Sequence, residues 1–128
     1  MYARAAALRQ YQNVGVQSEV FEASPHRLIQ MLFDGGLSRI AQAKGAMQNQ
    51  KFQLKGQLIG KAINIIAGLR DALNLETGGE LAQRLEALYV YMSKRLAEAN
   101  RTNDERILDE VAGLLRNIKE GWDGIAPV

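Results

Sequence analysis

SPHRLIQMLFDGGLSRIAQAKGAM, residues 24–47, is the stretch that decides the fold. Its apolar positions recur every three or four residues, which is the repeat of a helix face packed against other helices. They are Ile29, Phe33, Gly36, Ile40, Ala43 and Met47. Ser24 and Pro25 predict the helix start, because serine caps an N-terminus and proline at the first helical position has no N–H to lose. The polar run 48–51 predicts a connection.

Three further helical repeats follow. The second predicted helix runs from Phe52 to Leu73, with apolar positions Leu58, Ala62, Ile65, Leu69 and Ala72, flanked by Ile59, Ile63, Ile66 and Leu73. The third carries Leu81, Leu85, Leu88, Met92, Leu96 and Ala99, and the fourth carries Ile107, Leu108, Val111, Leu114, Leu115, Ile118 and Trp122. Thr77 with Glu80, and Thr102 with Glu105, have capping-box spacing and predict the starts of these two helices.

The length of the chain and the positions of its prolines favour one all-α domain. The chain has 128 residues, enough for one modest core. No proline lies between Pro25 and Pro127, which favours helices over sheet. Short connections between four helices predict an antiparallel four-helix bundle over residues 24–122. Residues 1–23 are predicted to form an N-terminal cap segment of the same domain, packed across the bundle.

The N-terminal segment contains Leu8, Tyr11, Val14 and Val16, which are too sparse for a fifth core helix and too apolar for a solvated tail. Two interpretations stay open. The segment covers an apolar groove on the bundle, or it packs as an ordinary N-terminus.

Composition argues against an enzyme. The chain has no cysteine and one histidine, His26, at a predicted helix start. A di-iron bundle needs two Glu-x-x-His motifs, and a phosphotransfer bundle needs an exposed histidine in mid-helix. We therefore expect no catalytic residue, no metal and no cofactor, and a solvated His26.

Charge and hydropathy limit the partners. The net charge is +2, from 16 basic and 14 acidic residues, so nucleic acid is not an expected partner. The chain lacks both a secretory signal and an apolar run of membrane-spanning length, so we expect a cytoplasmic protein without membrane insertion. Between Asp34 and Asp71 every charged residue is basic. These cations either pair within the bundle or face an acidic partner.

Two residues stand out inside the helical repeats. Gly36 occupies an apolar position, although glycine in a helix costs about 1 kcal/mol relative to alanine. Close approach of a backbone would offset this cost, from a neighbouring helix or from a bound segment. Tyr91 points away from the face that carries Tyr89 and Met92. It is either an incidental exposed aromatic or part of a groove for a partner helix.

The chain resembles the FliS family. The opening "YQNVGVQSEVFEASPHRLIQMLFDGGLSRI" is similar to the family's N-terminal tyrosine, its helix start and its Met-Leu-aromatic-Asp-Gly stretch. "KAINIIAGLRDALN" resembles the family's second helix, and "GGELAQRLEALYVYMSKRLAEAN" its third, with a Leu-Tyr-x-Tyr-Met run. "NDERILDEVAGLLRNIKEGW" fits the close. The resemblance covers nearly the whole chain in order.

This resemblance implies a cytoplasmic chaperone without enzymatic activity or cofactor. Such a chaperone binds the C-terminal region of flagellin, prevents premature polymerisation and delivers flagellin to the flagellar type III export apparatus. Tyr11 matches the family's N-terminal tyrosine, in a segment that covers part of the client site. The expected partner-binding residues are Leu8, Tyr11, Val14, Val16, Gly36 and Tyr91. The alternative is a helical adaptor or anti-aggregation module for another amphipathic client. The oligomeric state is left open.

Overall fold

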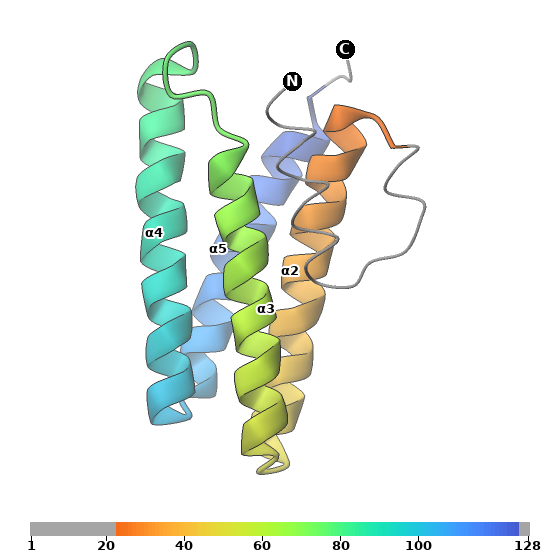
Figure 1. Ribbon diagram of the computed structural model, residues 1–128, viewed down its shortest axis with the longest axis vertical. Helices are drawn as coiled ribbons and strands as arrows, with labels where there is room; N and C mark the ends of the chain where they lie inside the picture. Colours follow the sequence, from red (N-terminus) through yellow and green to blue (C-terminus); the bar gives the residue numbers. More distant parts are fainter. Residues whose placement is uncertain (1–22, 126–128) are drawn as a thin grey trace.

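The computed structural model describes residues 23–125, and these form four antiparallel helices (Figure 1). The helices are α2 (Pro25–Gln48), α3 (Phe52–Asp71), α4 (Gly79–Thr102) and α5 (Glu105–Asp123). The predicted all-α four-helix bundle is confirmed, and so is the connection between the first two helices. The expected packing of residues 1–22 across the bundle lies outside the described residues.

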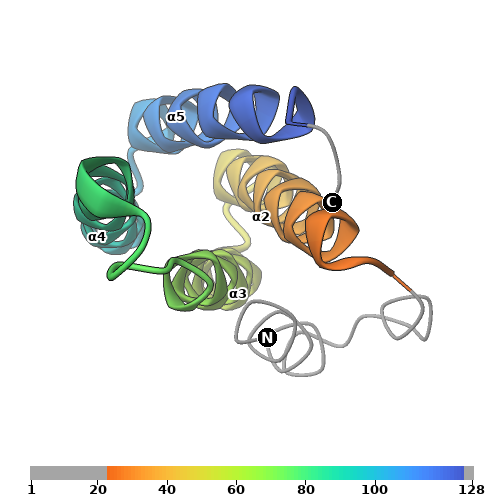
Figure 2. The ribbon, with the colours of Figure 1, turned by 90° about the horizontal axis from the view of Figure 1, so that it is seen from above.

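Each helix packs on two others. Seen along the bundle, α2 lies beside α3 and α5, and α4 lies beside the same two helices (Figure 2). Helix α5 is tilted, so it lies beside α4 near the α4–α5 connection and beside α2 at its own C-terminus (Figures 1 and 2). Helices α4 and α5 therefore diverge toward the end of the bundle where α4 begins. None of the four helices is both long enough and apolar enough to cross a membrane.

The first helix start is confirmed. The Ser24 hydroxyl accepts a hydrogen bond from the Arg27 N–H at 3.1 Å, with Pro25 at the first helical position. The capping box predicted for α4 is wrong, because Gly78 precedes that helix and contributes no side chain. Gly79 has φ of +58°, a conformation that glycine adopts without strain. Thr77 thus lies in the turn that precedes the helix, and its N–H donates to the Asn74 side chain.

The capping box predicted for the start of α5 is wrong as well, because the capping residue lies two positions later in the chain. Asn103 ends α4 in the left-handed region, with φ of 54°, where asparagine is among the best-tolerated residues. The chain then reverses at Asp104, whose carboxylate accepts from the Arg106 N–H at 3.0 Å. Asp104, not Thr102, therefore caps the helix.

The core contains most of the predicted apolar positions. In α2 all six are buried, and in α3 Leu58, Ala62, Ile65 and Leu69 are buried. Met92, Leu96 and Ala99 of α4 and Leu108, Val111 and Leu115 of α5 are fully buried. Gly36 lies in this core, where an added Cβ would be 3.0 Å from Leu115 Cδ2. Close packing against α5 thus accounts for the glycine.

One charged side chain is buried among the described residues. Lys55 of α3 is 5% exposed, and its Nζ donates to the Asn100 carbonyl of α4 at 2.8 Å. The same ammonium donates to the Asn103 side chain. A cation here satisfies carbonyls that the helix end leaves free and complements the negative end of the helix dipole. Lys55 therefore fastens the end of α4 to α3.

Candidate functional site

An apolar groove opens where α4 and α5 diverge. It has a volume of about 430 Å³, within the range of ordinary ligand sites. All four helices contribute to it, together with the chain just after α3 and just after α5. It is lined by Ile29, Phe33, Leu69, Ala72, Leu73, Leu81, Leu85, Tyr89, Asn117, Ile118, Gly121, Trp122 and Ile125.

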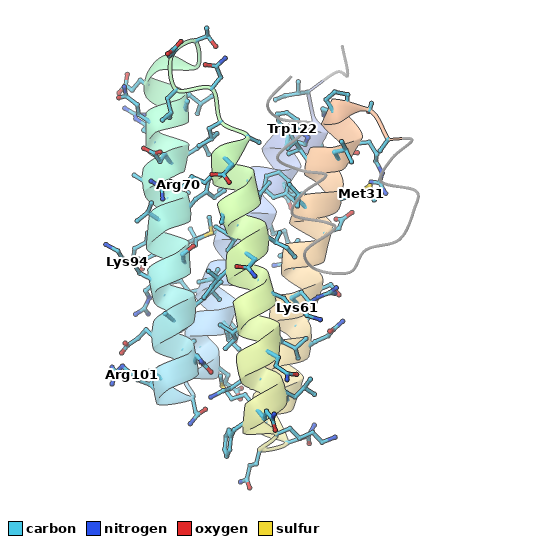
Figure 3. All side chains as sticks on the ribbon, in the orientation of Figure 1. Met31, Lys61, Arg70, Lys94, Arg101 and Trp122 are labelled. Carbon is cyan, nitrogen blue, oxygen red and sulfur yellow. The ribbon has the colours of Figure 1, made fainter. Side chains whose placement is uncertain are left out.

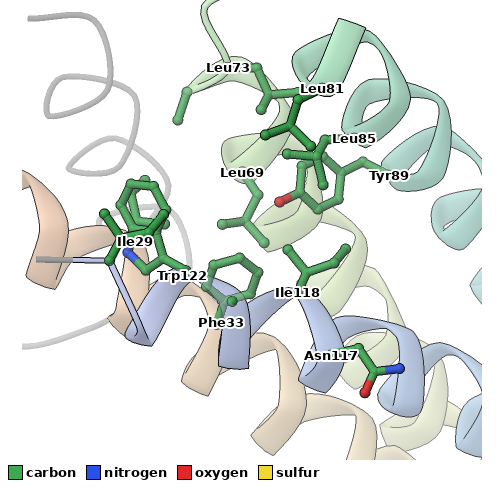
Figure 4. A pocket seen from close by; sticks show the side chains of 13 residues that line it. Ile29, Phe33, Leu69, Leu73, Leu81, Leu85, Tyr89, Asn117, Ile118 and Trp122 are labelled. Atoms are coloured by element: carbon green, nitrogen blue, oxygen red, sulfur yellow. The ribbon is translucent and has the colours of Figure 1, made fainter. Parts of the chain in front are cut away.

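Two walls face each other across the groove (Figure 4). One wall comes from the chain just after α3 and from the first half of α4, and includes Leu73, Leu81, Leu85 and Tyr89. The other comes from the start of α2 and the end of α5, and includes Ile29, Phe33, Ile118 and Trp122. These are the residues that the helical repeat directs inward, so the walls are apolar wherever the helices separate.

The lip of the groove is apolar as well. Leu81 is 68% exposed, and Leu75 and Ile125 are 42% and 53% exposed. All three lie at the end of the bundle where the groove opens. Leu81 and Ile125 also line the groove. Exposed apolar area costs about 25 cal/mol per Å² in water, so a ligand that buries these side chains is favoured.

Two reciprocal hydrogen bonds join the start of α2 to the end of α5 beside the groove. The Trp122 ring N–H donates to the His26 carbonyl at 3.1 Å, and His26 Nε2 lies 3.0 Å from the Trp122 carbonyl. Because a carbonyl can only accept, Nε2 carries the hydrogen. The two rings also stack, with centroids 4.8 Å apart. The expectation of a solvated His26 is therefore wrong: it is half-buried and joins two helix ends.

The lining contains little that could react. Its polar side-chain groups are the Tyr89 hydroxyl, the Asn117 amide and the Trp122 N–H. Burial raises the pKa of Tyr89 to about 12, so its phenol stays neutral over the physiological range. Within residues 23–125 no group of three or more His, Cys, Asp or Glu side chains is placed to hold a metal ion. The groove can shield apolar side chains from water, and its lining supplies no evident acid, base or nucleophile.

Of the six partner-binding residues expected from the sequence, the structure describes Gly36 and Tyr91, and neither lines the groove. Leu8, Tyr11, Val14 and Val16 fall outside the described residues. Gly36 is buried beneath Leu115, away from the groove lining. Tyr91 is 42% exposed, and its hydroxyl donates to Glu110 of α5 at 2.6 Å. Their roles in partner binding stay predictions.

The helical repeat instead predicts four of the groove residues as core positions. Leu81, Leu85, Ile118 and Trp122 follow the same repeat as the buried positions, yet none of them is fully buried. One sequence signal pointed to them: Leu81 comes two residues after Gly79, in the first turn of its helix. An apolar repeat that begins in the first turn extends to the end of a bundle, where covering helices are least complete.

Fold and site together define a class of protein: small all-α bundles with an open apolar groove. The family model described as "Flagellar protein FliS" matches residues 7–128. The chain is 57% identical over 98% of its length to "Flagellar secretion chaperone FliSB" of Pseudomonas aeruginosa strain PAO1, covering 99% of that protein. It is 46% identical to "Flagellar secretion chaperone FliS" of Salmonella typhimurium, over 96% of this chain and 92% of that protein.

A relative of lower sequence identity has the same name. "Flagellar secretion chaperone FliS" of Bacillus subtilis is 37% identical over 83% of this chain and 78% of that protein. The chain belongs to the FliS family.

Proposed function

We propose that this chain is a flagellar secretion chaperone whose groove receives an amphipathic segment from the C-terminal region of flagellin. The observation that carries the proposal is the open apolar groove between α4 and α5, with its exposed leucine lip. Family membership supports the flagellar role, since the relatives are named flagellar secretion chaperones. The protein acts without catalysis or cofactor, in the cytoplasm.

The mechanism is recognition of a helix in a groove. A client segment that is unstructured alone folds into an amphipathic helix on binding, with residues at i, i+3 or i+4 and i+7 directed into the groove. The two facing walls bury these side chains between α4 and α5. Flagellin surfaces needed for polymerisation are then hidden until the flagellar export apparatus receives the client.

The N-terminal segment is proposed to regulate access. Residues 1–17, with Leu8, Tyr11, Val14 and Val16, cover part of the groove in the free chaperone and move aside for the client. Position supports this, because the chain enters α2 beside His26, which contacts Trp122 of the groove wall. Competition for the groove lowers client affinity but protects an apolar surface from self-association.

The groove is tested with two aspartate substitutions of exposed leucines. Leu81→Asp places a carboxylate on the lip, while Leu54→Asp does so at the opposite end of the bundle, where Leu54 is 44% exposed. Both variants should stay folded, because neither side chain is in the core. By calorimetric titration with a flagellin C-terminal fragment, Leu81→Asp should weaken binding at least about tenfold, and Leu54→Asp should leave it unchanged. Equal affinities for wild type and both variants would exclude this groove as the client site.

The covering segment is tested separately by hydrogen exchange. Protection within residues 1–17 should change when the flagellin fragment binds. Deletion of these residues should increase self-association, and Tyr11→Ala should weaken client binding through a lost aromatic contact, typically about 1 to 3 kcal/mol. Unchanged protection, together with unchanged affinity in both variants, would contradict the proposal.

A further inference from the structure

Charge is distributed unevenly along the bundle. We divide the described chain at the helix midpoints into a groove half (residues 23–36, 62–90 and 114–125) and a far half (residues 37–61 and 91–113). The groove half has seven acidic and five basic side chains, and the far half has five acidic and nine basic ones. The two halves therefore carry formal charges of −2 and +4. Figure 3 shows Trp122 at the acidic end and Arg101 at the basic end.

The distance between the ends keeps these charges separate in solution. Helix α2 has 24 residues and is about 36 Å long at 1.5 Å per residue. Charges in water are screened within about 10 Å at 0.1 M salt. A ligand at the groove therefore experiences mainly the acidic half.

Ion pairs already occupy most of the basic groups of the groove half. Arg27 and Asp34 lie 3.9 Å apart, and Arg70 and Glu86 lie 3.4 Å apart. Arg84 pairs with Glu80, and Lys119 lies between Asp34 and Asp123.

Three exposed carboxylates are left over. Asp71, Glu76 and Glu120 have no ion-pair partner among the described residues. Glu76 follows the exposed Leu75, and Glu120 precedes Gly121 of the lining, whereas Asp71 lines a separate pocket together with Arg70 and Lys94. Arg116 is the one basic side chain of this half without an ion pair among residues 23–125, so the unpaired charges of the groove half sum to −2.

Building on the proposed function, we propose that the groove selects client helices in which lysine or arginine flanks the apolar stripe. Such residues suit both features of the opening. Their aliphatic stems can lie on the exposed Leu75, Leu81 and Ile125 while the cationic heads stay in water near the carboxylates. The same carboxylates discriminate against a helix flanked by glutamate.

The charge also argues against a second copy of this chain as the occupant. A symmetric dimer formed through the grooves would bring two acidic halves together. Like charges directly opposed across an interface are unfavourable. A basic amphipathic segment from another protein meets no such penalty.

The experiment uses three helical peptides that share one apolar stripe and differ only in four flanking residues: lysine, glutamine or glutamate. Fluorescence anisotropy with the full chain at 0.1 M salt should give the tightest binding for the lysine peptide and the weakest for the glutamate peptide. The expected ratio is about fivefold to tenfold, falling below about twofold at 0.5 M salt because exposed charges are screened. Equal affinities at 0.1 M salt would overturn the inference.

A matched pair of triple variants locates the effect. Asp71→Asn, Glu76→Gln and Glu120→Gln together remove the unpaired carboxylates and leave the intrachain ion pairs intact. This variant should bind the lysine and glutamate peptides within about twofold of each other. The control replaces Arg39, Lys51 and Lys61 by glutamine. These three side chains lie in the far half and have no ion pair among residues 23–125. The control should keep the full preference, and loss of the preference in the control would also contradict the inference.

Failure of this inference can be told apart from failure of the proposed function. If Leu81→Asp abolishes binding of the flagellin fragment while the three peptides bind equally, the client site stands and charge selection is wrong. If Leu81→Asp abolishes a charge-dependent binding of the lysine peptide but leaves the flagellin fragment bound, charge selection stands and flagellin is not the client of this groove.

Discussion

Leu81 and Leu96 belong to the same apolar repeat of α4, yet their surroundings differ completely. Leu96 is 0% exposed, in the half of the bundle where α4 and α5 lie together, whereas Leu81 is 68% exposed, where they diverge. The apolar repeat predicts both as core positions with equal reason. The difference teaches that a helical repeat identifies the face a helix presents inward. Whether another helix covers that face depends on the angle between the helices.

Side-chain contacts hold α5 in this tilted position. On the closed side, Glu110 of α5 accepts hydrogen bonds from Tyr91 and Arg95 of α4, at 2.6 and 2.9 Å. At the open end, Trp122 bonds to His26 of α2 instead. Helix α5 therefore changes its neighbour along its length, and the space it leaves beside α4 becomes the groove.

The strongest test of this comparison places one aspartate in the closed core and another in the groove wall. Ile66→Asp should unfold the bundle, because Ile66 is 1% exposed and an unpaired buried carboxylate costs several kcal/mol against a total stability of about 5 to 15 kcal/mol. Leu85→Asp, in the half-buried groove wall, should stay folded but lose client binding. Circular-dichroism melts compare the two variants. A wild-type melt for Ile66→Asp would show that the α3 core is assigned wrongly.

Two leucine-to-alanine substitutions compare the closed core with the groove lip through smaller changes in stability. Leu108→Ala should destabilise the protein by about 2 to 5 kcal/mol, because Leu108 is fully buried and its removal leaves a cavity. Leu81→Ala should change the free energy of unfolding by less than about 0.5 kcal/mol, as exposed positions usually do. Urea unfolding gives both values. Similar losses in the two variants would mean that the groove is closed in the free protein.

A substitution of the buried Lys55 tests what holds the C-terminal end of α4 at the closed end of the bundle. Lys55→Met keeps the length of the side chain but removes both hydrogen bonds to the end of α4. The Asn100 carbonyl then loses its partner, which we expect to cost about 1 to 3 kcal/mol. Lys51→Met, at an exposed position four residues earlier, is the control and should be nearly neutral. Hydrogen exchange should show fraying at the C-terminus of α4 in Lys55→Met, with the groove walls unaffected.

Much of the fold followed from the sequence, and less of the site. The repeat in residues 24–47 and Ser24 with Pro25 located the first helix, because spacing and capping are local properties. The capping boxes failed where Gly79 and Asn103 adopt left-handed conformations that shift each helix start. The groove was missed because it depends on the tilt of α5, which local patterns do not encode. The contact of Trp122 with His26 spans almost the whole bundle in sequence.

The smallest expected effect concerns the polar contact that marks the closed side, Tyr91 and Arg95 with Glu110. Hydrogen bonds from Tyr91 and then Arg95 hold the pKa of Glu110 below its usual value. A lowered carboxyl pKa contributes stability that is present above the unfolded pKa, about 4.3, and is lost as pH falls through the folded pKa. The hydrogen bond to Glu110 also raises the pKa of Tyr91. That contribution is present below about pH 10 and is lost as pH rises through the raised value.

These two pH dependences predict how the stabilities of the variants differ from that of wild type as pH changes. Glu110→Gln should be less stable than wild type at pH 7, and the two urea-unfolding curves should converge as the solution is acidified below about pH 4. Tyr91→Phe should differ from wild type at pH 7 and converge toward it above about pH 10. Both differences should be smaller than that of Lys55→Met, because the groups are largely exposed and water and salt screen them. A constant difference from pH 3 to pH 11 would mean that this contact does not stabilise the closed side, and that core packing alone keeps α4 and α5 together there.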